Sequence, residues 1–272
     1  MTAPALVLLA HGHSDPQIAE ITHVMRHELM ARSPELTVRA AYLGSSGPSP
    51  VQVVSKLARL GTEEVVLVPL EIGCAYRASA VARDELGRLT SAFPELRFEL
   101  ARPIGPEPVL LTLLDRTLRQ ALSDHHVTEL DGLVLSSAGS EDIRSRSLLA
   151  RRTRQWGLHH KLACVTAFTD DTGPSVEDAI ETLWHQGRRH IAVGSWFLSA
   201  SDVWVQQAES ALAAGAIAVS RPMSAGPEIA ELAMHRYLVG AMDLIDFGDL
   251  LPEEESFEDD SEETPRLQAI GA

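Results

Sequence analysis

The chain has 272 residues, enough for two domains of ordinary size, since a domain takes roughly 100–200 residues. Its apolar content of 45% can build a core, but no apolar run approaches the roughly 18 residues of a membrane span. The two cysteines and the lack of a signal-peptide pattern predict a cytoplasmic protein. The net charge of −15 is unlike the basic face of a nucleic-acid binder, so we expect neither a nucleic-acid nor a membrane partner.

The first half of the chain reads as alternating strands and helices. We expect strands near 4–10, 36–43, 64–70 and 96–101, and helices near 16–32, 49–60, 78–92 and 106–122. The strands are short apolar runs without polar alternation, which is typical of parallel strands covered on both faces. Alternation of strand and helix predicts an α/β fold with a doubly wound parallel sheet.

The expected helix at 16–32 shows how local signals set an element. It follows Asp15-Pro16, a capping acid and a proline suited to the first turn. An apolar stripe predicts the face that the helix buries; it comprises Ile18, Ile21, Val24, Met25 and Leu29.

The second half of the chain repeats the first. Three motifs recur in order at offsets of 127, 126 and 121 residues, namely Leu6-Val7-Leu8 with Leu133-Val134-Leu135, Gly47-Pro48-Ser49 with Gly173-Pro174-Ser175, and Gly105-Pro106-Glu107 with Gly226-Pro227-Glu228. The repeat predicts two tandem flavodoxin-like domains, residues 1–124 and 131–245, joined by a polar linker near 123–130.

An acidic tail follows the second domain. Residues 246–272 hold ten acids against one base, a charge of −9, which leaves −6 of the total of −15 for the rest. Dense like charge and few apolar residues predict a disordered segment. Its expected role is solubility, with binding of a protein partner or scavenging of metal as alternatives.

The first strand ends in an unusual polar cluster. His11 and His13 follow the apolar run Leu6–Leu9 immediately, with Gly12 between them. In parallel sheets of this kind, ligands bind beyond the carboxyl ends of the strands. The next helix begins there and its N-terminus favours anionic groups.

The stretch LLAHGHSDP, followed by VPLEIGCAYRASAVARDEL, resembles the class II chelatases, the sirohydrochlorin and cobalt chelatase family. YLGSSGPSPVQVV and GRRHIAVGSWFLSASDVW extend the resemblance to all of the chain before the tail. It implies two chelatase-like domains packed as a pseudo-dimer around a cleft. It also implies a lyase that inserts Fe²⁺ or Co²⁺ into a carboxylate-rich tetrapyrrole in siroheme or cobalamin biosynthesis. No tightly bound cofactor is implied, because the divalent metal is itself a substrate.

The resemblance also implies roles for particular residues. His11 matches the family's first histidine and would accept pyrrole protons and contact the metal. His13 and Glu71, which replace residues usual in the family, are candidates for further metal ligands. Residues expected to bind the macrocycle are Gly12, Ser14, Ser45, Ser46, Tyr76 and Arg77.

Two expected ligands are missing. Gly44 stands where the family has a glutamate and Arg77 where it has a second histidine, and arginine cannot ligate a metal. In the second copy, Ala138 stands at the position of His11. The alternative is therefore a degenerate relative that binds a tetrapyrrole or a metal as a carrier, sensor or regulatory partner. A recruited relative with different chemistry is a third reading.

Each candidate residue also has a structural reading. His11 could only cap the turn, His13 could be an exposed loop residue, and Cys74 could be a small buried residue rather than a thiolate. Glu71 could pair with Arg77 or another base, and Arg77 could hold a substrate carboxylate or form a structural ion pair.

Two further groups draw attention. Trp196, Phe197 and Trp204 could flank a flat ring or pack in the core. His159 and His160 are adjacent, and because sequence neighbours point in different directions on a helix, the pair is not a metal site by itself.

Overall fold

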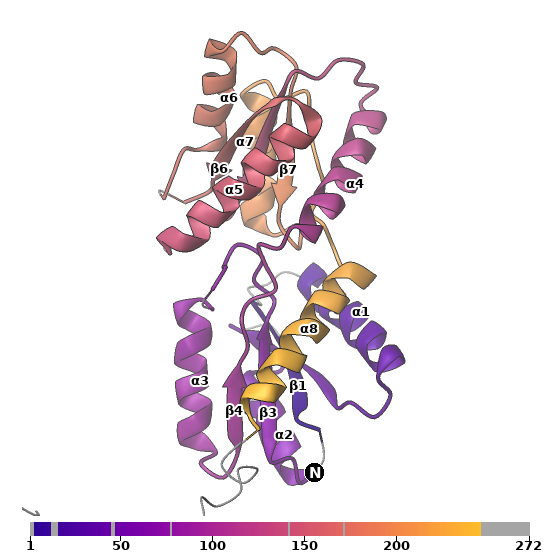
Figure 1. The fold of residues 1–272 in the computed structure, drawn as a ribbon, viewed down its shortest axis with the longest axis vertical. Coiled ribbons are helices and arrows are strands. Elements are labelled where there is room, and N and C mark those ends of the chain that lie inside the picture. The colour runs from indigo at the N-terminus through magenta and orange to yellow at the C-terminus, as the bar shows by residue number, and fades with distance from the viewer. Residues whose placement is uncertain are drawn as a thin grey trace, which may run out of the picture.

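The computed structural model describes residues 3–11, 16–44, 47–76, 78–140, 142–170 and 172–245 (Figure 1). Its strands are β1 (Ala5–His11), β2 (Val38–Leu43), β3 (Glu64–Pro69), β4 (Arg97–Leu100), β5 (Gly132–Ser137), β6 (Ala163–Phe168), β7 (Ile191–Trp196) and β8 (Ala218–Val219). Its helices are α1 (Pro16–Arg32), α2 (Pro50–Arg59), α3 (Ala80–Ala92), α4 (Val109–Asp124), α5 (Ile143–His160), α6 (Val176–His185), α7 (Asp202–Ala213) and α8 (Pro227–Asp243).

The strands form two parallel sheets of the same topology. The strand orders are β2-β1-β3-β4 and β6-β5-β7-β8. The predicted α/β fold with two repeated parallel sheets is confirmed. In each sheet the chain leaves the first strand to one side and returns on the other, so the first and third strands flank the point where the strand order reverses.

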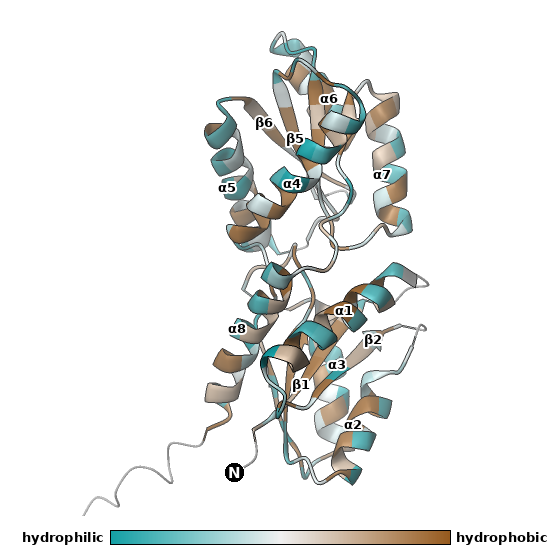
Figure 2. Cartoon of the chain, turned by 90° about the vertical axis from the view of Figure 1, so that its right-hand side faces the viewer, coloured by the Kyte–Doolittle hydropathy of each residue, from teal (hydrophilic) through white to brown (hydrophobic). Residues whose placement is uncertain are grey.

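The strands are buried on both faces, as the apolar runs predict. Leu6 and Leu8 of β1 belong to one apolar cluster, whereas Val7 and Leu9 belong to a second cluster against α2 and α3. The first cluster continues into the second sheet through Leu133 and Leu135. Figure 2 shows the apolar strands inside and the polar sides of the helices outside. The two halves therefore share one apolar core.

The last helix of each half is exchanged. α4 packs on β7 and β8 of the second sheet, and α8 packs on β3, β4 and α1 of the first (Figure 1). Glycine allows the close approach on both sides: a Cβ on Gly240 of α8 would lie 2.9 Å from Val66 Cγ1, and one on Gly194 of β7 would lie 3.1 Å from Leu114 Cδ1. The predicted domains, residues 1–124 and 131–245, are continuous in the chain. In the structure, α4 of the first packs on the second sheet, and α8 of the second packs on the first sheet.

The predicted stripe on α1 is wrong at one position. Ile18, Ile21, Met25 and Leu29 are buried, but Val24 is 39% exposed. Thr22 is buried instead, and its hydroxyl lies 2.5 Å from the Tyr42 hydroxyl and also donates to the Ile18 carbonyl. A polar side chain can take this core position because its hydrogen bonds are satisfied locally.

Some expectations fall outside the part that the structure describes. The acidic tail, 246–272, and the capping residue Asp15 lie there. The linker region near 123–130 is described, and Val127 and Leu130 pack against the core, so it is less polar in its contacts than expected.

Among the described residues, no helix has the length and apolar character needed to cross a membrane.

Candidate functional site

His11 and Glu71 meet at the carboxyl edge of the first sheet. His11 is the last residue of β1, and Glu71 lies two residues past the end of β3, the neighbouring strand. His11 Nε2 is 2.9 Å from Glu71 Oε1. The histidine side chain is 45% exposed, whereas that of the glutamate is 6% exposed. The strand order therefore places an accessible imidazole over a buried carboxylate where ligands of such sheets bind.

Ser79 fixes the carboxylate from the other side. Its hydroxyl donates to Glu71 Oε1 at 2.6 Å, and its backbone N–H donates to Oε2 at 2.9 Å. Ser79 also caps α3, since its Oγ accepts from the Ala82 N–H. Burial alone would raise the pKa of Glu71, but the hydrogen bonds from His11 and Ser79 outweigh it and lower the pKa. Glu71 is thus ionised at neutral pH.

The ionised carboxylate sets the tautomer of His11. A carboxylate can only accept hydrogen bonds, so Nε2 of His11 carries the proton that it shares with Glu71. In the neutral ring the lone pair is then on Nδ1, the atom that can take up a proton or contact a cation. Glu71 therefore pairs with His11. Arg77, the other partner that the sequence suggested, lies outside the described residues.

Cys74 offers no thiolate near this pair. Burial and the neighbouring Glu71 carboxylate raise the pKa of its thiol to about 12. The thiol therefore stays protonated at neutral pH, which favours the reading of Cys74 as a small packed residue.

Several predicted site residues cannot be placed beside His11. Those outside the described residues are Gly12, His13, Ser14, Ser45, Ser46 and Arg77. Their expected roles stay predictions. Tyr76 is described and is 48% exposed, with the guanidinium carbon of Arg102 lying 5.2 Å from its ring centroid. An exposed aromatic side chain with a cation over it could stack against a flat anionic ligand.

The loop that carries Glu71 and Tyr76 is fastened to the second half. The Ala75 N–H donates to Ser145 Oγ of α5 at 2.9 Å. The indole N–H of Trp196 donates to the Ile72 carbonyl at 2.9 Å, and Trp196 is only 1% exposed. Trp196 therefore packs between the halves and offers no face for stacking on a macrocycle, and Phe197 is buried as well.

A basic pocket opens next to Tyr76. It has a volume of about 550 Å³ and is lined by Tyr76, Ile143, Arg144, Ser147, Leu148, Arg151 and Arg154. Its three arginines lie seven and three positions apart on α5, so they share one helix face. In a chain of net charge −15, this is a local concentration of positive charge, and Ile143 and Leu148 add apolar side chains to the lining. It can bind a molecule that combines carboxylates with apolar surface.

Sequence reasoning missed Ser79 and the arginines of this pocket. A serine at the start of an expected helix is a recognisable cap, but nothing in the sequence indicates that it also binds Glu71. The arginine spacing of seven and three was a usable signal, because it marks one face of a helix.

Asp142 holds the helix end that supports this pocket. Its side chain caps α5, with Oδ2 accepting from the Ser145 hydroxyl at 2.6 Å and from the Ser145 N–H at 3.1 Å. The hydrogen bond from the Ser145 hydroxyl is the main cause that lowers the pKa of Asp142. The stabilisation is therefore present above the usual pKa of 3.8 and is lost as the pH falls through the lower folded value.

We expect Asp142→Ala to cost about 1 kcal/mol of unfolding free energy at pH 7, as loss of a helix cap does. The difference from the wild type should shrink below the usual pKa of 3.8. Urea denaturation at pH 7 and at acidic pH measures both. Asp84→Ala, which removes an exposed carboxylate within α3, is the control. A cost that is independent of pH would show that the charge of Asp142 contributes nothing.

Comparison with known proteins supports the relationship that the motifs suggested. A family model for CbiX matches residues 5–121 and again residues 132–238. The sirohydrochlorin cobaltochelatase of Priestia megaterium is 21% identical over 198 residues. That alignment covers 71% of this chain and 64% of the relative, so the chain spans less than two thirds of that protein.

Solved structures share the fold. SirB from Bacillus subtilis with Fe³⁺ superposes with a TM-score of 0.71 at 16% identity, covering 89% of this chain and 96% of SirB. The sirohydrochlorin chelatase SirB from Bacillus subtilis subspecies spizizenii in complex with cobalt gives 0.67 at 13% identity, covering 89% and 97%. Because the family model matches both halves and the fold agrees, this chain belongs to the CbiX family of class II chelatases.

Proposed function

We propose that this chain inserts a divalent metal, Fe²⁺ or Co²⁺, into sirohydrochlorin or a related carboxylate-rich tetrapyrrole, in siroheme or cobalamin biosynthesis. The observation that carries the proposal is the exposed His11 imidazole, which the buried Glu71 carboxylate holds at the point of the first sheet where the strand order reverses. Membership of the CbiX family supports the same reaction.

The chemistry asks for a base at this place. Metal insertion replaces two pyrrole protons with one dication, so the protons must pass to acceptors as the metal enters. Neutral His11 takes one of these protons on Nδ1 and the other passes to water, and Glu71 then faces the resulting imidazolium across a 2.9 Å hydrogen bond. Ser79 keeps the carboxylate in place while this charge develops. A buried carboxylate that stabilises an imidazolium makes the histidine a better base.

The basic pocket supplies the second requirement, which is to hold the substrate's carboxylates. Arg144 and Arg151 lie on the same α5 face as Ser147 and line the pocket together with Tyr76. Arginine pairs with carboxylates through two parallel hydrogen bonds. The hydrogen bond from Ala75 to Ser145 joins α5 to the loop that carries Glu71. It therefore links the basic pocket to the residue that holds His11.

The direct test is insertion itself. Protein is mixed with sirohydrochlorin and Co²⁺ or Fe²⁺ without oxygen, and the absorption spectrum is followed against a reaction without protein. A rate that exceeds the uncatalysed rate and saturates with substrate supports the proposal. A spectral shift on binding without a gain in rate contradicts the enzyme and favours a carrier, and no response to the tetrapyrrole contradicts both.

Removing an arginine from the pocket should weaken substrate binding more than turnover. We expect Arg144→Gln or Arg151→Gln to raise KM by about 10-fold, the value of one charge-assisted hydrogen bond, with kcat nearly unchanged. Steady-state insertion kinetics at two ionic strengths measure this. Arg59→Gln, which removes an exposed arginine of α2, should leave KM unchanged. Equal KM in all three variants would show that the pocket does not contact the substrate.

A further inference from the structure

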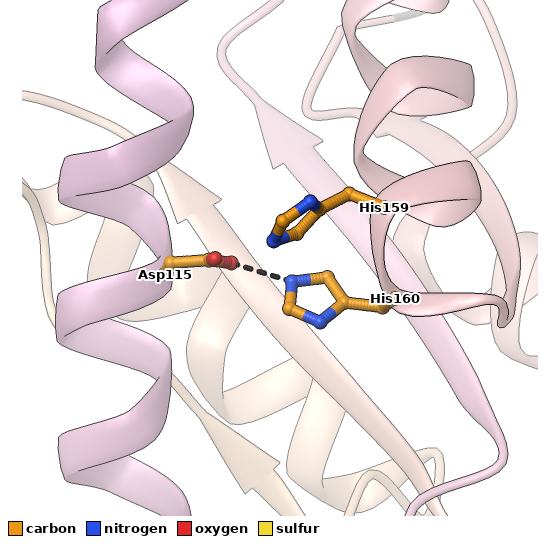
Figure 3. Close-up of side chains that lie close together, drawn as sticks. All are labelled: Asp115, His159 and His160. Carbon is orange, nitrogen blue, oxygen red and sulfur yellow. Dashed lines mark hydrogen bonds and ion pairs between the residues drawn. The ribbon is translucent and has the colours of Figure 1, made fainter.

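A second set of potential ligands lies away from the His11–Glu71 pair, between α4 and α5. Asp115 comes from the middle of α4, and His159 and His160 are the last two residues of α5. One ligand atom from each lies within 4.8 Å of the other two. Figure 3 shows a ring nitrogen of each histidine facing the carboxylate. Two imidazoles and one carboxylate are ligands that zinc, cobalt and nickel ions accept.

The carboxylate is already oriented in the free protein. Asp115 Oδ1 accepts from the indole N–H of Trp156 at 2.5 Å and is 2.8 Å from His160 Nε2. Trp156 is only 1% exposed, and the Asp115 and His160 side chains are 15% and 24% exposed. A ligand carboxylate held by a buried donor has the outer support that metal sites use to fix their ligands.

The end of α5 lets neighbouring histidines converge. The ring centroids of His159 and His160 are 4.9 Å apart and the rings meet edge to face. The helix stops at Lys161, which takes a left-handed backbone conformation. The negative end of the helix dipole lies at this point and favours a cation. The sequence predicts that this pair is no metal site by itself, and in the structure Asp115 offers a third ligand.

The charges around the cluster leave room for a cation. Arg119 is the arginine that pairs with Asp115, with Nη2 3.9 Å from Oδ2. Its side chain is 73% exposed and reaches the carboxylate only at the limit of an ion pair. A metal can therefore displace Arg119 into solvent at little cost.

We propose that Asp115, His159 and His160 bind a divalent transition-metal ion of the zinc, cobalt or nickel type, separate from the metal that the proposed reaction inserts. For binding, the proton of the neutral His160 ring moves from Nε2 to Nδ1 by exchange with solvent, and the Nε2 lone pair and the carboxylate then share the metal. Ligands of a tetrahedral site with bonds near 2.0–2.1 Å lie about 3.3 Å apart, so the 2.8 Å contact must widen only slightly. Solvent completes the coordination on the side of exposed His159.

The metal would join α4 and α5, two consecutive helices with β5 between them in the chain. α4 precedes the second sheet but packs on β7 and β8, and α5 follows β5. An ion that binds only the folded arrangement stabilises it by a free energy that grows with the logarithm of the ion's concentration. The site therefore acts as a clamp on the exchanged helix.

The test titrates the full-length protein with Co²⁺ in the absence of tetrapyrrole, following visible absorption and tryptophan fluorescence. We expect one site whose occupation changes the Trp156 signal and whose affinity falls at least about 10-fold in His159→Ala. The same site should persist in His11→Ala. His185→Ala, which removes an exposed histidine 3.5 Å from Glu181, is the matched control and should bind as the wild type does.

A second measurement does not depend on spectroscopy. Zn²⁺ should raise the melting temperature of the wild type and of His11→Ala but not that of His159→Ala. Because His159 is exposed, circular dichroism should show that this variant folds normally. Equal Co²⁺ affinity in His159→Ala and the wild type, or no Zn²⁺-dependent stabilisation of the wild type, would overturn the site. Insertion activity is measured separately, so failure of the proposed reaction leaves this result intact.

Discussion

Replacing His11 with alanine is expected to lower the rate of metal insertion by about 10²–10⁴-fold, the contribution typical of a positioned general base. The substitution removes the lone pair on Nδ1 that accepts a pyrrole proton. It should leave the fold intact, because the side chain is 45% exposed and its hydrogen-bond partner Glu71 keeps both hydrogen bonds from Ser79. Initial rates of absorbance change under anaerobic conditions measure the effect.

Two variants separate this role from a structural one. His23→Ala removes an exposed histidine of α1 and should insert metal at the wild-type rate. Glu71→Gln keeps the shape of the partner but removes the negative charge that faces the imidazolium, so it should lower the insertion rate although His11 is present. A His11→Ala variant that inserts metal at the wild-type rate would eliminate the proposed base.

Replacing Trp196 with alanine should produce a large loss of stability. The side chain is 1% exposed and lies between the halves, and truncating a buried tryptophan typically costs about 3–5 kcal/mol. Trp196→Phe keeps most of the apolar surface but leaves the Ile72 carbonyl without its donor, so we expect a smaller loss of about 1–3 kcal/mol. Equilibrium urea denaturation, followed by circular dichroism, gives both values.

The control is another tryptophan. Trp184 of α6 is 43% exposed, and its replacement with alanine should cost clearly less. If Trp196→Ala and Trp184→Ala were equally stable, the contact between Trp196 and the loop after β3 could not be holding the halves together.

Much of the fold could be predicted from the sequence because the patterns that mark strands and helix starts are local and occur in both repeats. Apolar runs mark the strands, and Ser49 and Ser175, which end the repeated Gly-Pro-Ser motif, both form capping boxes at the start of a helix. The error at Val24 arose because Thr22 satisfies its hydroxyl within the helix and against Tyr42, a contact between elements that periodicity does not encode.

The candidate site was less predictable, since it depends on strand order. His11 and Glu71 are 60 positions apart, and only the adjacency of β1 and β3 brings them together. The exchange of α4 and α8 and the meeting of Asp115 with His160 have the same origin, because the repeat indicates two units and says nothing of which helix covers which sheet.

That reciprocal exchange limits how the protein could have arisen and how it can come apart. The first sheet is covered by α8, from the end of the second copy, and the second sheet is covered by α4, which ends the first copy, so neither copy is a self-sufficient module in the present chain. Loss of order in one copy uncovers apolar surface on its neighbour, and the two are therefore expected to melt as one cooperative unit. A duplicated ancestor whose identical subunits traded this helix would need only a fused chain to reach the arrangement seen today.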